Sequence, residues 1–149
     1  MLNFWPGARS IALFLLPAGG AVHAEPPPVP PPAIVLHIVT SYQGKAPISL
    51  HDMPFVYRLR SAFRRADLPN DYLFELPVEG LQSIRVTSDS FLERRIVDLK
   101  KRTIEIEFKR TGNMQRMIFD FDRTSGEWLI TDIRDQRGGG LRQLLQIRP

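Results

Sequence analysis

The 149-residue chain contains no cysteine. A chain without thiols forms no disulfide framework, holds no thiolate-bound metal and offers no thiol nucleophile. The absence also excludes a lipid anchor attached through cysteine. Any folded domain in this chain must therefore be held together by its hydrophobic core.

The chain also lacks a hydrophobic run long enough to cross a bilayer. The apolar run at residues 11–16 is far short of the roughly 20 residues that a membrane-spanning helix needs. Arg9 precedes this run and small residues follow it up to Ala24, which is the order found in secretory signal peptides. We therefore expect residues 1–24 to be a signal peptide, cleaved between Ala24 and Glu25. The mature protein is then exported to the periplasm or the extracellular medium and has no membrane anchor.

A strong charge of one sign is missing as well, because 20 basic and 16 acidic residues leave a net charge of only +4. The two signs are interleaved, whereas a nucleic-acid-binding domain shows a concentrated basic face. We therefore expect no nucleic-acid partner.

Motifs for metals and cofactors are absent from the sequence. The predicted mature chain has two histidines far apart, His37 and His51, and no calcium-binding loop, so we expect no metal site. Residues 138–140 are three glycines, but they lack the Lys-Ser or Lys-Thr of a phosphate-binding loop. No G-x-S-x-G serine-hydrolase motif occurs. We expect no cofactor.

Prolines dominate residues 25–32, which read E-P-P-P-V-P-P-P. Consecutive prolines favour an extended polyproline II conformation. We interpret this segment as a linker that precedes one domain at residues 33–149, which is long enough to fold by itself. A ligand for a proline-recognising groove is the alternative interpretation.

Two segments at the start of this domain have helical features. Residues 33–42 are ambiguous, because their β-branched residues favour a strand although several apolar positions fall on one helical face. Residues 52–66 predict an amphipathic helix, with Asp52, beside His51, as its cap and Pro54 in its first turn. The apolar stripe of this helix comprises Phe55, Leu59, Ala62, Phe63 and Ala66, and its other face, which we expect to be solvated, carries Arg58, Arg60, Arg64 and Arg65.

A two-residue period dominates the second half of the chain and predicts strands at residues 103–110, 116–122 and 127–133, joined by hairpin turns. An earlier strand is expected at residues 81–87 or 91–99, and one of these two pairs with residues 103–110. The apolar positions are Ile104, Ile106, Phe108, Met117, Phe119, Phe121, Trp128 and Ile130.

A sheet with one apolar face must be covered, and the helix at residues 55–66 offers the strongest complementary stripe. The expected fold class is therefore α+β, with N-terminal helices packed on one face of a curved antiparallel sheet of about four strands. A short C-terminal helix follows the glycines at residues 138–140. We expect a pocket between helices and sheet. The outer sheet face has mixed charge and permits a homodimer.

The final strand, W-L-I-T-D-I at Trp128–Ile133, is followed by G-G-G-L-R-Q-L-L at Gly138–Leu145. With the preceding strands, this pattern resembles a family of bacterial exported proteins without an assigned function, placed in the nuclear transport factor 2-like (cystatin-like) superfamily. The resemblance covers roughly residues 33–147, and its C-terminal third is the specific part. It implies a cone-shaped fold in which residues 33–42 form a helix. Isomerases, cyclases, dehydratases and non-enzymatic binding modules share this fold, so it fixes no function.

Candidate catalytic groups are few. A general acid or base in this fold needs a position between helix and sheet with a carboxylate nearby. His37, with Tyr42 or Tyr57, is the candidate, and a half-buried core histidine is the alternative interpretation. Asp120 and Asp122 alternate with apolar residues, so we expect both on the solvent face rather than in an acid/base or cation site.

The function predicted from the sequence is therefore that of an exported, non-enzymatic binding module. It presents a hydrophobic pocket or a sheet surface to a small apolar ligand or a protein partner. One alternative is a pocket enzyme of the isomerase or cyclase type. Another is an immunity- or inhibitor-type protein that blocks a toxin or hydrolase through the basic face at Arg60 and Arg64.

Overall fold

The computed structural model describes residues 25–43, 48–66, 80–94, 97–124 and 126–148. The predicted signal peptide lies outside these residues, so its cleavage after Ala24 stays a prediction. No helix in these ranges has the length and apolar character that a bilayer crossing requires. The elements, in chain order, are α1 (Pro31–Gln43), α2 (Tyr57–Ala66), β1 (Gly80–Arg94), β2 (Val97–Arg110), β3 (Asn113–Thr124), β4 (Glu127–Asp135) and α3 (Leu141–Leu144).

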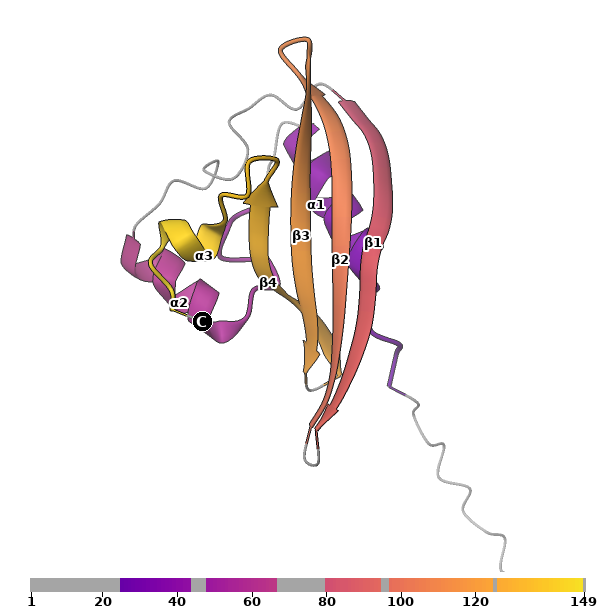
Figure 1. Ribbon diagram of the computed structural model, residues 1–149, viewed down its shortest axis with the longest axis vertical. Helices are drawn as coiled ribbons and strands as arrows, with labels where there is room; N and C mark the ends of the chain where they lie inside the picture. Colours follow the sequence, from indigo (N-terminus) through magenta and orange to yellow (C-terminus); the bar gives the residue numbers. More distant parts are fainter. Residues whose placement is uncertain (1–24, 44–47, 67–79, 95–96, 125, 149) are drawn as a thin grey trace, which may run out of the picture.

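The strands form one antiparallel sheet in the order β1-β2-β3-β4 (Figure 1). The β2–β3 turn is the pair Thr111–Gly112, and both residues have positive φ, as a tight hairpin requires. The three strands predicted by the two-residue period are confirmed within β2, β3 and β4. Of the two earlier candidates, residues 81–87 lie in β1 and pair with β2. The other candidate is not one strand, because residues 91–94 end β1 and residues 97–99 begin β2. The α+β class is thus confirmed.

The two-residue period places the apolar side chains of the strands on one face, called the inner face below. Residues opposite each other in an antiparallel pair point to the same side, so Ile104 opposite Phe119 and Phe121 opposite Ile130 build continuous rows. These rows join the helices and the segment 50–55 in one core. The buried core residues are Val35, Ile38, Val39, Tyr42, Leu50, Met53, Phe55, Leu59, Phe63, Ile104, Ile106, Phe108, Phe119, Phe121, Trp128, Ile130, Ile133 and Leu141.

Helix α1 confirms that residues 33–42 are helical, and it begins two residues earlier, inside the predicted linker, at Pro31. Proline is tolerated in the first turn because its missing N–H would have no partner inside the helix. α1 contacts β1 and β2 and lies behind them in Figure 1. The sequence pointed to residues 55–66 as the main cover of the sheet, but α1 is the helix that makes the larger contact with the strands.

The second helix starts later than predicted. α2 begins at Tyr57, so Asp52 and Pro54 precede it, and His51 and Asp52 lie in an exposed turn instead of a helix cap. The cause is tertiary: Phe55 forms a parallel bridge with Ile130 at the edge of β4. The Ile130 N–H donates to Pro54 O at 2.7 Å, and the Val56 N–H donates to Ile130 O at 3.0 Å. Pairing with the sheet edge therefore outweighs the local helix signal.

The other residues of the predicted apolar stripe are buried, with one exception. Leu59, Ala62 and Phe63 are buried, and the Phe63 ring lies 5.1 Å from the Phe55 ring between centroids. Ala66, in contrast, is exposed at the end of α2. The C-terminal helix predicted after the three glycines is confirmed as α3, which contacts β4.

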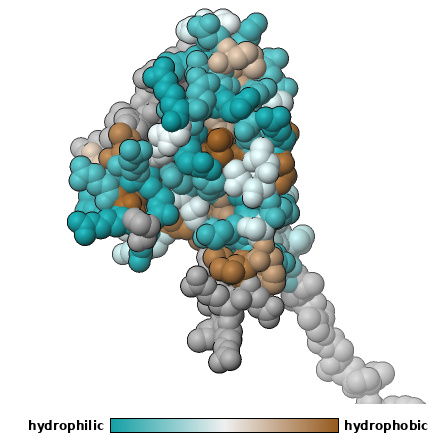
Figure 2. Space-filling view, viewed as in Figure 1, coloured by the Kyte–Doolittle hydropathy of each residue, from teal (hydrophilic) through white to brown (hydrophobic). Residues whose placement is uncertain are grey.

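The outer face of the sheet carries charged residues that pair with one another. The Glu105 carboxylate accepts hydrogen bonds from Arg85, and Arg116 lies within ion-pair distance. Asp120 accepts hydrogen bonds from Arg134 at 2.7 and 2.9 Å. Figure 2, viewed from the side opposite α1, shows this face as mostly hydrophilic, with hydrophobic side chains gathered near the β1–β2 hairpin.

Candidate ligand cavity

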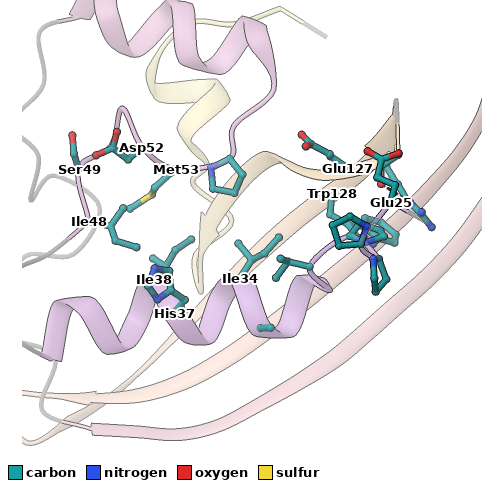
Figure 3. A pocket seen from close by; sticks show the side chains of 18 residues that line it. Glu25, Ile34, His37, Ile38, Ile48, Ser49, Asp52, Met53, Glu127 and Trp128 are labelled. Carbon is teal, nitrogen blue, oxygen red and sulfur yellow. Dashed lines mark hydrogen bonds between the residues drawn. The ribbon is translucent and has the colours of Figure 1, made fainter. Parts of the chain in front are cut away.

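A cavity of about 1060 Å³ lies beside α1, where four separate segments of the chain meet (Figure 3). Its walls are the proline-rich residues 25–29, the first turns of α1 at residues 33–38, the loop at residues 48–54 and the β3–β4 turn at residues 123–128. No two of these walls are neighbours in sequence except the first two. The fold, and not a local motif, therefore creates the cavity.

α1 provides one wall through residues spaced three and four apart. Ile34, His37 and Ile38 lie on the same helical face, and Figure 3 shows them across the cavity from Ile48 and Met53. The helix start that carries Ile34 is fixed by the carbonyl of Pro30, which accepts hydrogen bonds from the N–H groups of residues 33 and 34. The proline-rich wall is thus continuous with the helix.

Hydrogen bonds anchor the loop wall at both ends. The Ser41 hydroxyl donates to Ile38 O at 2.6 Å and accepts from the Ile48 N–H at 3.1 Å, which ties the loop to α1. At the other end, the pairing of Pro54 and Val56 with Ile130 ties it to β4. Loops that are held at both ends by a scaffold are common positions for binding groups.

The fourth wall is built around Trp128, a residue that is only 8% exposed. The guanidinium groups of Arg102 and Arg123 lie 5.4 and 6.0 Å from the Trp128 ring centroid. The Arg123 Nε donates to Gly126 O at 3.1 Å, and Gly126 has a φ of +85° that favours glycine. Gly126 is therefore held close to the Arg123 side chain, beside the indole.

Negatively charged side chains lie at the mouth of the cavity. The lining residues Glu25, Asp52 and Glu127 are exposed, so their carboxylates lie at the rim, whereas Ile38 and Met53 are buried and form the floor. An apolar floor with a few polar groups at its edge is the usual composition of small-molecule sites.

The structure does not bring the predicted catalytic residues together. His37 lines the cavity and is exposed, and Asp52 lines the same cavity. Tyr42, however, is buried in the core, and Tyr57 is 82% exposed at the start of α2. Neither tyrosine lines the cavity. The residue that follows the predicted cleavage point, Glu25, belongs to the proline-rich wall.

A second hollow of about 500 Å³ adjoins the cavity, because Pro28, Arg123 and Trp128 line both. Three cations surround it, Lys100, Arg102 and Arg123, which we call the basic cluster. The sequence interpretation passed over this cluster. Counting in steps of two back from Ile104 reaches Arg102 and Lys100, so cations continue the inner-face positions where apolar residues would be expected.

The remaining candidates lie elsewhere. Arg58, Arg64 and Arg65 are exposed on α2, as expected, but Arg60 is half-buried and its guanidinium donates to Phe55 O.

Asp120 and Asp122 lie on the outer sheet face, away from the cavity. Burial raises the pKa of Asp122, and nearby Lys101 opposes this shift. Bonding to Asp120 raises the pKa of Arg134, and bonding to Glu105 raises that of Arg85.

Within the described ranges, no three histidine, aspartate or glutamate side chains gather in a way that could hold a metal ion. No protein-family model matches the chain, and no curated protein and no solved structure matches it either.

Proposed function

We propose that this chain is a small-molecule-binding module whose ligand, a largely apolar compound, occupies the cavity beside α1. The observation that carries the proposal is the cavity itself: its volume of about 1060 Å³ is at the upper end of the range for ligand sites, and buried Ile38, Met53 and Trp128 line it. Burying apolar ligand surface against this floor supplies the driving force.

The proposal extends to the compartment and to the fold family. Residues 1–24 have the order of a secretory signal peptide, and cleavage after Ala24 leaves Glu25, a lining residue, as the first residue of the exported protein. Two N-terminal helices before a four-stranded antiparallel sheet, with α1 against β1 and β2, support a cone of the nuclear transport factor 2-like kind.

Binding is preferred to catalysis because of where the tyrosines lie. An isomerase or cyclase site built on His37 needs a second polar group that faces the same reacting atoms. Tyr42 and Tyr57 both lie outside the cavity lining. Asp52 lines the same cavity as His37, but among the described residues no hydrogen bond joins their side chains. A binding site needs no such convergence.

The proposal is tested by filling the cavity. Ala33 lines the cavity, whereas Leu36, on the same helix, is 44% exposed and does not line it. We expect the neutral fluorophore N-phenyl-1-naphthylamine to bind the wild-type chain with enhanced emission. Ala33→Trp should weaken this binding by about tenfold or more, because the indole occupies the space of the probe.

Leu36→Trp is the matched control and should bind the fluorophore as the wild type does. Circular dichroism of both variants reports whether the helix and sheet content is kept. Equal binding by the two variants would refute the cavity as the ligand site.

A further inference from the structure

The basic cluster is a product of strand register. Phe91, Lys100, Arg123 and Trp128 are opposite one another across the four strands, so their side chains form one row on the inner face of the sheet. Asp89 opposite Arg102 begins the next row, which continues to Phe121 and Ile130. The inner face therefore changes from apolar to cationic at the end of the sheet near the β1–β2 hairpin.

The cations of this cluster exceed the carboxylates that neutralise them. Arg102 donates to Asp89 at 2.6 Å, and its Nε atom is buried without a hydrogen-bond partner among the described residues. Lys100 lies 5.7 Å from the Phe91 ring centroid, and among the described residues the Arg123 side chain donates a hydrogen bond to one acceptor, the carbonyl Gly126 O. In the part of the chain that is described, Lys100 and Arg123 form no ion pair.

The hollow and the cavity have opposite charge. The cavity lining has three carboxylates, Glu25, Asp52 and Glu127, and one cation, Arg123, which it shares with the hollow. The lining of the hollow has three cations and one carboxylate that is already paired. A ligand with an anionic end is repelled by the acidic rim and attracted to the basic cluster. Arginine pairs favourably with carboxylate and phosphate oxygens.

Exposed apolar surface lies beside this charge. Phe91 is 53% exposed on β1, and Trp128 and Pro28 connect the hollow to the cavity floor. One ligand can therefore contact both spaces, with an apolar body in the cavity and a charged head group in the hollow.

We propose that the ligand is an anionic amphiphile: its hydrocarbon body lies in the cavity beside α1, and its carboxylate or phosphate head is held by Lys100, Arg102 and Arg123. This inference rests on the proposed function, because it assigns the chemistry of the ligand for the same cavity. It adds a selectivity that an apolar cavity alone does not have.

The test compares three ligands with the same ten-carbon chain: decanoate, decyl phosphate and the neutral decanol. Each is titrated against the exported protein, residues 25–149, by displacement of N-phenyl-1-naphthylamine. We expect at least one of the two anions to bind about tenfold tighter than decanol at low salt. The preference should weaken as salt screens the cluster. The tighter of the two anions identifies the head group.

A charge-neutralising double variant, Lys100→Gln with Arg123→Gln, should lose the preference for anions and keep the affinity for decanol. Its matched control is Lys101→Gln with Arg116→Gln, which removes the same charge from the outer sheet face and should keep the preference. Lys100 is exposed, so the single Lys100→Gln variant provides the same test, with a smaller loss of about threefold, if the double variant does not fold.

Two results separate the two proposals. Equal affinities of the wild-type chain for all three ligands, or a preference that survives in the double variant, would overturn the anionic head site and leave the apolar cavity in place. Failure of the fluorophore and of decanol to bind would overturn the cavity as a ligand site, and the head-group assignment with it.

Discussion

Trp128 is the residue that joins the sheet to both hollows. It is nearly buried, it continues the row of Phe91, Lys100 and Arg123, and it lines the cavity as well as the smaller hollow. Two guanidinium groups lie close to its ring, an arrangement that stabilises a cation near an aromatic face. At the residue scale, this side chain sets the boundary between apolar and charged surface.

Asp120 and Asp122, both on β3, should respond oppositely to replacement by asparagine. Asp120 accepts hydrogen bonds from Thr103 and Arg134, so Asp120→Asn should lower the free energy of unfolding by about 1–2 kcal/mol. Asp122 differs because burial raises its pKa above the usual carboxyl value. Its charged form therefore opposes folding, and Asp122→Asn should raise the melting temperature at pH 7.

The sign of the pH dependence follows from linkage. A carboxyl whose folded-state pKa is raised binds its proton more tightly when folded, so the protein gains stability as the pH falls through that raised pKa. The advantage of Asp122→Asn should therefore shrink between neutral pH and pH 3.8, the ordinary value for this group. Thermal unfolding of both variants at several pH values checks the pair. Destabilisation by Asp122→Asn at pH 7 would contradict this interpretation.

For individual residues, the sequence predicts much of the burial pattern of the sheet. The alternation of Ile104 and Ile106 with charged residues predicts which side chains are buried, because a strand turns successive side chains to opposite faces. The same alternation, extended to Arg102 and Arg123, would have identified the basic cluster. That cluster was missed because cations at a strand end are ordinarily assigned to solvent.

At the scale of elements, the open edge of β4 pairs at two places with segments that are not strands. Phe55 bridges Ile130, and Arg134 bridges Gly140 in the antiparallel sense. Edge strands present unpaired backbone groups that invite aggregation, so these bridges protect β4. They also place α2 and α3 on the β4 side of the sheet, as Figure 1 shows.

The contact that holds α3 gives a prediction for a glycine. The Asp132 carboxylate accepts hydrogen bonds from the N–H groups of Ile133 and Arg142 at 2.9 and 3.1 Å. A Cβ atom at Gly140 would lie 2.7 Å from Asp132 Oδ2, so the carboxylate would have to move away from these partners. Gly140→Ala should lower the free energy of unfolding by about 1–3 kcal/mol.

The adjacent Gly139 supplies the control, because its Cβ would lie 3.5 Å from the Asp135 carboxylate oxygens, an ordinary contact. Gly139→Ala should change the free energy of unfolding by less than about 0.5 kcal/mol. Urea unfolding of the two variants measures both values. Equal losses of stability would show that the Asp132 contact does not hold α3.

Elements were predicted unevenly, for a physical reason. Strands joined by short hairpins are set by local alternation and turn residues, so β2, β3 and β4 follow from the sequence. The start of α2 does not, because the pairing of Phe55 with Ile130 joins residues that are far apart in the chain. For residues 33–42, β-branched side chains favour a strand, and the packing of Val35 and Val39 into the core stabilises the helix instead.

At the scale of the whole molecule, the sheet, α1, the loop at residues 48–54 and the proline-rich segment line a cavity and an adjoining hollow with different chemical environments. The sequence predicts a pocket between helix and sheet, because an apolar sheet face must be covered. It does not predict which residues line the pocket, since they come from four segments and include Pro26–Pro28, which the sequence indicates as a linker or as a ligand for a proline-recognising groove. Lining residues become visible only when the segments are brought together.

The account as a whole depends on this cavity holding a ligand. Native mass spectrometry of the exported protein, isolated from the cells that express it, tests this most directly when wild type, Ala33→Trp and Leu36→Trp are compared. We expect wild type and Leu36→Trp to carry the same additional small-molecule mass and Ala33→Trp to lack it. A wild-type chain with no bound mass, or the same bound mass in Ala33→Trp, would contradict the account.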